Sequence, residues 1–417
     1  MTIALLLCYL LTVAAGFALN ALNIRHLRRY GSIVPAGFEG AIDPETLART
    51  TAYTLEKNRL ELVESLFDTL LLVLFLFGGL LGLYDRWIAS LSDSFIGSAV
   101  LFLLLLTFVQ TILGIPFGLY STFRIENRYG FNTTTARLWI GDFAKSQAIG
   151  VLLLTLLTAA AFWLIQWSPS HWWIWVWTFM AVFSLFMMFI SPFLIEPLFN
   201  KFEPISAEGL EDEIRLLMEK VGLKVGRVMQ MDASRRSKHS NAYFTGIGRV
   251  KRIVLFDTLI KQMSRAEIVA ILAHEIGHWK LRHILKRIVI LEILMLGGSW
   301  LAFEALKWPG LPGLLGLQEA SYPAKFIILG FFASLLSFPM TPLSAWLSRR
   351  NEYAADDFAC GITGKPEALA SALIKLSGEN LSNLHPHPFY ARFYYSHPPM
   401  VERVRKLKGE AKTLEGR

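Results

Sequence analysis

The chain has 417 residues, of which 53% are hydrophobic and only 18% are charged, so it is too apolar for an ordinary soluble protein. Its net charge of +8 is not accompanied by a basic region interleaved with stacking aromatic side chains, so a nucleic-acid partner is not expected. The composition therefore predicts a polytopic protein embedded in a lipid bilayer.

Apolar stretches of sufficient length recur along the chain. A transmembrane helix needs about 20 largely apolar residues. Seven stretches meet this requirement, namely 2–22, 66–84, 95–120, 147–167, 172–195, 286–306 and 323–347. Lys and Arg gather after the first and third stretches, before the sixth and after the seventh. By the positive-inside rule, this distribution predicts an external N-terminus and a cytosolic C-terminus.

Two polar segments, 200–285 and 348–417, lie outside these stretches, and the predicted topology puts both on the cytosolic side. The first segment begins with a predicted amphipathic helix around 206–222. Short β-like runs follow at 226–232, 240–246 and 252–259. Ser264 and Glu267 then form an S-x-x-E capping box, which predicts the start of a helix. The expected organisation is a membrane part, 1–199 and 286–347, and a polar domain in two parts, 200–285 and 348–417.

The helix predicted after Ser264 carries the pattern H-E-x-x-H. His274 and His278 are four residues apart, so their side chains share one helix face and can bind one ion. In zinc proteases with this pattern, two neutral imidazoles hold Zn²⁺ and the adjacent carboxylate, here Glu275, deprotonates the metal-bound water. A solvated surface helix is the alternative. The apolar residues AILA just before the motif argue against it, because buried imidazoles without partners are costly.

A catalytic zinc ion needs a third protein ligand and one open position. Glu352, in SRRNEYAADDFA, is the candidate, because the two predicted membrane helices between His278 and Glu352 form a hairpin that returns to the same side. Asp356 follows one helical turn later on the same face. The alternative role for Glu352 is an ordinary ion pair with Arg349 or Arg350.

Several stretches together with the seven predicted spans resemble the integral-membrane zinc endopeptidases of the CAAX prenyl protease type. These stretches are PLFNKFEP, SNAYFTG, KRIVLFDTL, HEIGHW, NEYAADDFA and YSHPPMVERV, and the resemblance covers nearly the whole chain. It implies one Zn²⁺ ion held by His274, His278 and Glu352, with Glu275 as general base and Asp356 beside a ligand histidine. It also implies that the seven helices enclose a water-filled chamber roofed by the catalytic domain, and that the enzyme cleaves near the C-terminus of CAAX peptides.

Other residues carry weaker expectations. Asn241, Ala242 and Tyr243 would lie on a strand beside the H-E-x-x-H helix, where an extended peptide can add through backbone hydrogen bonds; the alternative is an ordinary core strand. His397 is expected either to hydrogen-bond the reaction's oxyanion or to act as a structural cap. Arg403 would orient an acidic side chain of the site or lie in solvent. Four histidines are expected to be surface or loop residues rather than ligands: His239, His283, His385 and His387.

The sequence therefore predicts a mainly α, seven-helix membrane protein with a zincin-like α+β catalytic domain facing the cytosol. Its expected activity is zinc-dependent hydrolysis of CAAX-like or other flexible peptides, in a bacterial inner membrane or the endoplasmic reticulum membrane. Two alternatives remain: a metalloprotease of membrane-protein quality control, and a non-catalytic membrane scaffold with a structural zinc. The scaffold is disfavoured because closed zinc sites prefer four Cys or His ligands.

Overall fold

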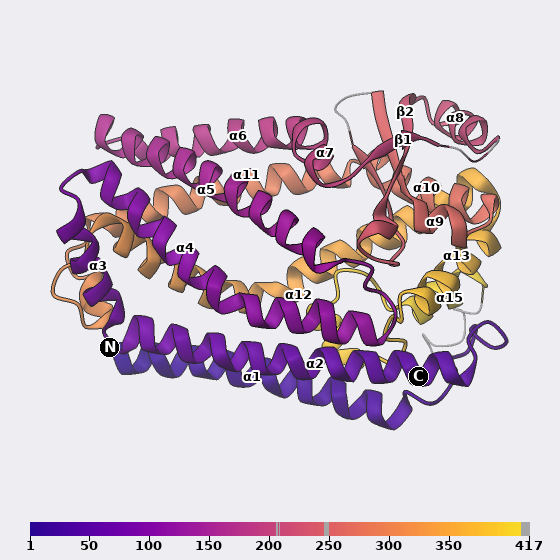
Figure 1. The fold of residues 1–417 in the computed structure, drawn as a ribbon, viewed down its shortest axis with the longest axis horizontal. Helices are drawn as coiled ribbons and strands as arrows, with labels where there is room; N and C mark the ends of the chain where they lie inside the picture. The colour runs from indigo at the N-terminus through magenta and orange to yellow at the C-terminus, as the bar shows by residue number, and fades with distance from the viewer. Residues whose placement is uncertain (206, 208, 246–249, 410–417) are drawn as a thin grey trace.

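The molecule consists of a bundle of long helices with a small mixed domain at one end (Figure 1). The computed structural model describes residues 1–205, 207, 209–245 and 250–409. In Figure 1 the long helices run along the longest axis of the molecule, whereas the strands and most of the short helices gather at the end where α10 and α15 lie.

Six helices in the described part of the chain are long and apolar enough to cross a membrane, and a bent helix pair brings the total to as many as seven. The six are α1 (Thr2–Tyr30), α4 (Phe95–Tyr120), α5 (Ala136–Trp167), α6 (Trp172–Leu194), α11 (His283–Lys307) and α12 (Tyr322–Thr363). Helix α4 continues as η2 (Ser121–Glu126), and α6 is followed by α7 (Glu196–Phe199). Large apolar side chains on them are exposed, for example Leu11 at 71% and Leu336 at 69%. Lipid-facing surfaces are expected to expose such side chains.

The bent pair corresponds to the second predicted span. Helix α2 (Pro44–Leu72) continues as η1 (Val73–Phe77) and is bent by 66° from α3 (Leu80–Leu91). Gly79 lies at the bend with φ of 84°, a left-handed conformation that glycine adopts without steric cost. The predicted number of spans is thus confirmed, but the stretch 66–84 is a broken helix rather than a straight one.

The mixed domain contains a four-stranded sheet with strand order β1-β2-β4-β3. The strands are β1 (Phe202–Pro204), β2 (Lys224–Met231), β3 (Ala242–Thr245) and β4 (Val250–Phe256). Only β2 and β4 are parallel, and β3 lies at the edge with Ala242 opposite Leu255. The three predicted β-like runs, 226–232, 240–246 and 252–259, overlap β2, β3 and β4, but 257–259 form the start of a helix, and Gly246 lies outside the described residues. The short strand β1 was not predicted.

Helices pack around this sheet to form the main soluble core. They are α8 (Leu210–Lys220), α9 (Asp257–Gln262), α10 (Arg265–Lys280), α13 (Pro366–Glu379) and α15 (Met400–Leu407), with a short 3₁₀ turn at Ala233–Arg235. Helix α14 (Pro388–Tyr394) packs instead on α1 and α12, and a second 3₁₀ turn, Pro312–Leu315, lies between α11 and α12 among the membrane helices. Ile253, Leu255, Leu272 and Ile276 are buried in one apolar cluster. Full burial of such a side chain contributes about 1.5–3 kcal/mol, so this cluster fixes α10 against the sheet.

Helix α12 joins the membrane part to the mixed domain without a break. It has 42 residues and carries Glu352 and Asp356 on the same helix as the membrane-spanning residues. The predicted boundary between 347 and 348 therefore lies inside a continuous helix, and the boundary between 285 and 286 lies inside α11. The consequence is that a predicted metal ligand is held directly by a membrane helix.

Candidate metal centre

The start of α10 is fixed by its capping box. Glu267 Oε2 accepts a hydrogen bond of 2.7 Å from the backbone N–H of Ser264, and Ser264 Oγ accepts one of 3.4 Å from the N–H of Glu267. Ser371 and Lys375 of α13 also donate to the Glu267 carboxylate. Burial alone raises the pKa of Glu267, but these hydrogen bonds outweigh it and hold the pKa below its usual value. The buried Glu267 carboxylate thus links the helix that carries the histidines to α13.

Helices α10 and α12 approach each other closely at Gly277. A Cβ atom at this position would lie 3.0 Å from Cα of Ala355, closer than side-chain atoms normally pack. Because Gly277 precedes His278 and Ala355 lies between Glu352 and Asp356, the contact sets the separation of the two halves of the site. The sequence alone gave no reason to single out this glycine.

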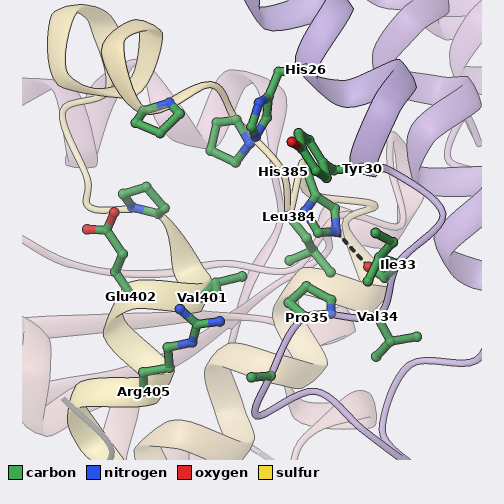
Figure 2. A pocket seen from close by; sticks show the side chains of 14 residues that line it. His26, Tyr30, Ile33, Val34, Pro35, Leu384, His385, Val401, Glu402 and Arg405 are labelled. Carbon is green, nitrogen blue, oxygen red and sulfur yellow. Dashed lines mark hydrogen bonds between the residues drawn. The ribbon is translucent and has the colours of Figure 1, made fainter. Parts of the chain in front are cut away.

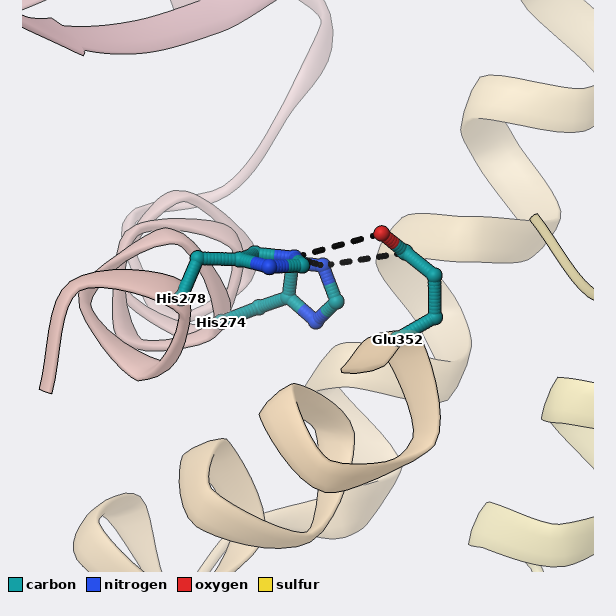
Figure 3. Close-up of side chains that lie close together, drawn as sticks. All are labelled: His274, His278 and Glu352. Atoms are coloured by element: carbon teal, nitrogen blue, oxygen red, sulfur yellow. Dashed lines mark hydrogen bonds and ion pairs between the residues drawn. The ribbon is translucent and has the colours of Figure 1, made fainter. Parts of the chain in front are cut away.

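The three predicted metal ligands converge across this helix pair (Figure 3). Nε2 of His274 and Nε2 of His278 are 3.2 Å apart. Glu352 extends from α12 toward both, with its oxygens 3.4 Å from His274 Nε2 and 3.2 Å from His278 Nε2. One ligand atom from each residue lies within 4.8 Å of the others, a spacing that can hold a metal ion.

The protonation of these side chains fits a bound cation. Asp356 Oδ1 lies 2.8 Å from His274 Nδ1, so a neutral His274 carries its proton on Nδ1 and directs the bare Nε2 toward His278. Glu352 Oε2 is buried, and it lies 3.4 Å from His274 Nε2 and 3.6 Å from Arg403 Nη1. Two imidazole nitrogens and a carboxylate that converge in this way are a ligand set of two nitrogens and one oxygen, which suits a divalent metal.

The electrostatics of the site also favour positive charge. Burial alone lowers the pKa of His274, but hydrogen bonds to Asp356 and Glu352 outweigh it and raise the pKa to about 9. Arg403, which is only 4% exposed, donates to Asp356 through Nε at 2.8 Å and Nη2 at 2.6 Å. Its Nη1 lies 3.6 Å from Glu352 Oε2. Arg403 therefore joins the carboxylate behind His274 to the carboxylate that faces both histidines.

Glu275 stands next to the ligands without being one of them. Within the described part of the chain, its carboxylate has no hydrogen-bond or ion-pair partner. Burial raises its pKa above the usual value, although the neighbouring His274 and His278 oppose the shift. A carboxylate that is unpaired and has a raised pKa is suited to accept and return a proton.

The alternative ion pairs of Glu352 are not formed by the described residues. Arg349 instead donates to the backbone oxygens of Tyr395 and Ala391, at 2.7 and 3.3 Å. The guanidinium of Arg350 lies 5.0 Å from the centre of the Trp346 ring. Both arginines are thus engaged away from Glu352.

The structure brings His397 and the predicted peptide strand to the same end of the molecule. His397 Nε2 is 3.4 Å from Glu352 Oε1, and its side chain is 61% exposed. Asn241 is exposed and its carbonyl oxygen accepts a 3.1 Å hydrogen bond from the N–H of Phe256, continuing the ladder between β3 and β4. Ala242 is buried in the core, whereas Tyr243 donates a 2.8 Å hydrogen bond to Glu196 at the end of the membrane helix α6.

The remaining histidines occupy specific positions rather than a common surface. Nε2 of His239 lies 3.3 Å from Oε2 of Glu126, and Nδ1 of His239 lies 3.1 Å from Oδ1 of Asn380. His283 was expected at the surface, but it is only 7% exposed and its Nδ1 lies 3.1 Å from Nδ1 of His278. Its spacing of five residues from His278 is not a helix-face spacing, so no sequence pattern indicates this contact.

His385 and His387 lie where the end of α1 and the residues after it meet the C-terminal segment, and Figure 2 shows His385 there. A pocket of about 380 Å³ separates the end of α1, with His26 and Tyr30, from the C-terminal segment. His385 Nε2 donates to the carbonyl oxygen of Ile33 at 2.7 Å, and the N–H of His387 donates to Asn23 at 2.9 Å. These contacts hold the first helix against the segment that leads to His397.

Comparisons with known proteins agree with this geometry. Residues 23–201 match the family model described as the CAAX prenyl protease N-terminal region with five membrane helices, and residues 204–411 match peptidase family M48. The CAAX prenyl protease 1 homolog of Arabidopsis thaliana is 35% identical over 402 residues, which cover 92% of both chains. The human homolog is 31% identical over 447 residues, covering 92% of this chain and 90% of its own.

A bacterial protein and a solved structure are also similar. The uncharacterized metalloprotease YhfN of Bacillus subtilis is 29% identical over 383 residues, covering 91% of this chain and 89% of its own. The crystal structure of S. mikatae Ste24p superposes with a TM-score of 0.88 at 29% identity, covering 97% of this chain and 98% of that one. With two family models spanning the chain and relatives above 30% identity along almost all of it, this protein belongs to peptidase family M48 and is a multi-pass membrane metalloendopeptidase of the CAAX prenyl protease type.

Proposed function

We propose that this metalloendopeptidase binds one Zn²⁺ ion through His274, His278 and Glu352 and hydrolyses peptide bonds near the C-terminus of flexible, CAAX-like peptides. The observation that carries the proposal is the convergence of two imidazole Nε2 atoms and the Glu352 carboxylate on one point. Relatives in plants and mammals that span about nine tenths of the chain are named CAAX prenyl proteases, which supports the substrate class.

Zinc is the metal that this ligand set suits best. Catalytic zinc sites commonly have two histidines and one glutamate and keep a fourth position open for water. The site contains no thiolate, and its two imidazoles favour zinc over magnesium or calcium, which prefer oxygen ligands. When bound, the ion supplies a Lewis acid that polarises the substrate carbonyl and lowers the pKa of water.

Different side chains of the protein transfer the proton, stabilise the developing negative charge and orient a ligand histidine. Glu275 takes the proton from the attacking water and returns it to the nitrogen of the leaving amine, which its raised pKa favours. His397, beside Glu352 at the exposed side of the site, donates a hydrogen bond to the oxygen on which negative charge develops. Asp356 and Arg403 orient His274 through the contact at its Nδ1.

The edge strand β3 offers a place for an extended substrate. Because the sheet order ends at β3, one side of this strand lacks a neighbouring strand among the described residues. Backbone groups from Asn241 to Tyr243 can therefore pair with a peptide, and β3 contacts the helix α10 that carries the histidines. Such pairing uses hydrogen bonds of the main chain and does not depend on side-chain identity. It therefore suits flexible substrates of varied sequence.

The proposed setting is a bacterial inner membrane or the endoplasmic reticulum membrane, with the catalytic end on the cytosolic side. The basic residues in the last turns of α1 and around the start of α11 lie on the side of the mixed domain, which supports this orientation. In this arrangement the membrane helices would wall a water-filled chamber that leads to the metal centre.

A single preparation of purified protein tests the proposal. Zinc is quantified by elemental analysis, and cleavage of a CAAX-terminated peptide is measured before and after treatment with a chelator. We expect close to one zinc per chain, cleavage near the peptide's C-terminus, loss of activity with the chelator and recovery on adding zinc. A tightly bound zinc with no hydrolysis of any peptide would instead favour the non-catalytic scaffold.

A further inference from the structure

The turn between α10 and α11 has an unusual backbone conformation. Helix α10 ends at Lys280 and α11 begins at His283, so only two residues connect them. Arg282, the second of them, has φ of 58° and is one of two non-glycine residues with positive φ in the described part of the chain. Such a conformation is costly for a residue with a side chain and persists only where the surroundings enforce it. Its effect is to bring His283 back against the end of the metal-binding helix.

His283 meets His278 on the side away from the other ligands. The two Nδ1 atoms are 3.1 Å apart, and the ring centres are 5.2 Å apart with the planes at 73°. The opposite nitrogen of His278, Nε2, faces His274 and Glu352 at 3.2 Å each. Each ring nitrogen of His278 therefore has a separate partner.

This arrangement fixes which nitrogen carries the proton. A neutral histidine that binds a metal through Nε2 carries its hydrogen on Nδ1. That N–H points at Nδ1 of His283, so His283 must accept with a bare Nδ1 and carry its own hydrogen on Nε2. Metal-binding histidines usually donate this second N–H to a carboxylate, a carbonyl or water, as His274 does to Asp356. At His278 a second imidazole takes that place.

We propose that His283 is a positioning residue for the metal centre, which accepts a hydrogen bond from Nδ1–H of His278 and thereby fixes the tautomer and ring orientation of that ligand. This inference rests on the proposed function, since it assumes a metal bound at Nε2 of His278. It also accounts for the strained turn at Arg282, because a relaxed connection would not return His283 to this position.

The competing explanation is that His283 only fills space at the helix junction. Three variants separate the two roles. His283→Leu keeps a side chain of similar bulk but removes the acceptor, and His283→Asn keeps an acceptor, since its Oδ1 is joined to Cγ as Nδ1 is. Lys286→Leu is the matched control, placed on the exposed first turn of the same helix.

Metal binding is measured directly on the full-length purified proteins. Zn²⁺ affinity is determined by competition with a chelator, and the geometry at the ion is followed by the visible spectrum of the Co²⁺-substituted protein. We expect His283→Leu to weaken zinc binding by about 10- to 100-fold, the usual effect of losing such a partner, and to shift the cobalt bands. His283→Asn should recover most of the affinity and the spectrum, and Lys286→Leu should match the wild type.

Unchanged affinity and spectrum in His283→Leu would overturn the inference while leaving the proposed function intact. Equal losses in the leucine and asparagine variants would show a purely steric role and overturn it too. If the leucine protein does not fold, His283→Ala takes its place, and wild-type zinc affinity in that variant is decisive against the proposal. A wild type that binds no zinc would contradict the proposed function itself.

Discussion

At the residue scale, the metal centre is a closely spaced set of opposite charges that depend on one another. Glu352, Asp356 and Arg403 are each at most 5% exposed. Ions removed from water in this way are costly unless each is paired, and removing one member leaves an uncompensated charge. Arg403 faces both carboxylates and offsets their repulsion, and it shares Asp356 Oδ1 with His274 Nδ1. The site is thus preorganised before any substrate arrives.

Replacing Glu275 tests the general base without disturbing the ligands. We expect Glu275→Gln to abolish cleavage, because an amide cannot accept the proton of water, while zinc content and thermal stability stay at wild-type levels. The measurements are peptide turnover and metal analysis on one preparation. Near wild-type turnover in this variant would remove Glu275 from the mechanism.

Glu352 should behave differently, because it is proposed to hold the ion. In Glu352→Ala two imidazoles remain, and we expect both zinc occupancy and rate to fall, with occupancy well below one per chain at neutral pH after dialysis. Asp357→Ala is a control on the same helix, since Asp357 is exposed and pairs only with Lys406 at 2.7 Å. Full zinc occupancy in Glu352→Ala would mean that another group supplies the third ligand.

At the element scale, the site depends on how closely α10 and α12 pack. The two histidines belong to one helix and the carboxylates to the other, so their convergence is set by the distance between the helix axes rather than by side-chain reach. Gly277 allows the backbones to approach, and the capping box at Ser264 and Glu267 fixes where α10 begins. The cap could be predicted from the sequence, whereas the approach could not, because nothing in a single sequence marks which glycine faces another helix.

A methyl group added at Gly277 should therefore separate the ligands. Gly277→Ala places Cβ 3.0 Å from Cα of Ala355, so α10 must shift, and overpacking of this kind costs about 1–3 kcal/mol. We expect a lower melting temperature and weaker zinc binding. Gly361→Ala is the matched control, because a Cβ there meets nothing within 4 Å, and it should be neutral or slightly stabilising through helix propensity. Equal behaviour of the two variants would refute the close-packing explanation.

At the scale of the whole molecule, the catalytic end is bound to the membrane helices at several points. Glu126, at the end of the helix formed by α4 and η2, accepts a 2.6 Å hydrogen bond from Tyr53 of α2 and lies 3.3 Å from His239. Tyr243 of β3 bonds to Glu196 after α6. Together with the unbroken α12, these contacts make the metal centre and the membrane bundle one structural unit.

The loops at the two ends of the bundle allow the proposed orientation to be tested. The N–H of Ser321 donates to Asp85 at 2.8 Å, so the connections 85–94 and 308–322 share one end, whereas Lys408 donates to the carbonyl of Gly37 at the other. We expect single cysteines at 85–94 and 308–322 to react with a membrane-impermeant thiol reagent in intact cells, and those at 30–50 to react only after lysis. The reverse labelling would place the metal centre outside the cytosol.

Most of the fold and the convergence of His274, His278 and Glu352 could be predicted from the sequence, for identifiable reasons. The membrane helices and the shared helix face of the two histidines follow from local patterns, namely long apolar runs and H-E-x-x-H, which are visible directly in the sequence. The bend at Gly79, the continuity of α12 past 347 and the return of His283 to His278 depend on contacts between distant or differently oriented segments. Glu352 was identifiable only because the hairpin of α11 and α12 brings it back to the side of His278.

The same architecture constrains which substrates reach the metal. The proposed ligands come from α10 of the mixed domain and from the membrane helix α12, and the edge strand β3 lies beside α10, an arrangement that favours an extended chain pairing through its backbone. We therefore expect a CAAX-like sequence to be cut as a free peptide and as a flexible tail, but not inside a compact folded domain.

All three forms are incubated with the wild type and with Glu275→Gln, and the products are identified by mass spectrometry. Equal cleavage of all three forms by the wild type alone would contradict an enclosed site and favour a quality-control protease that acts on folded or damaged proteins. Cleavage that persists in Glu275→Gln would instead argue against Glu275 as the general base.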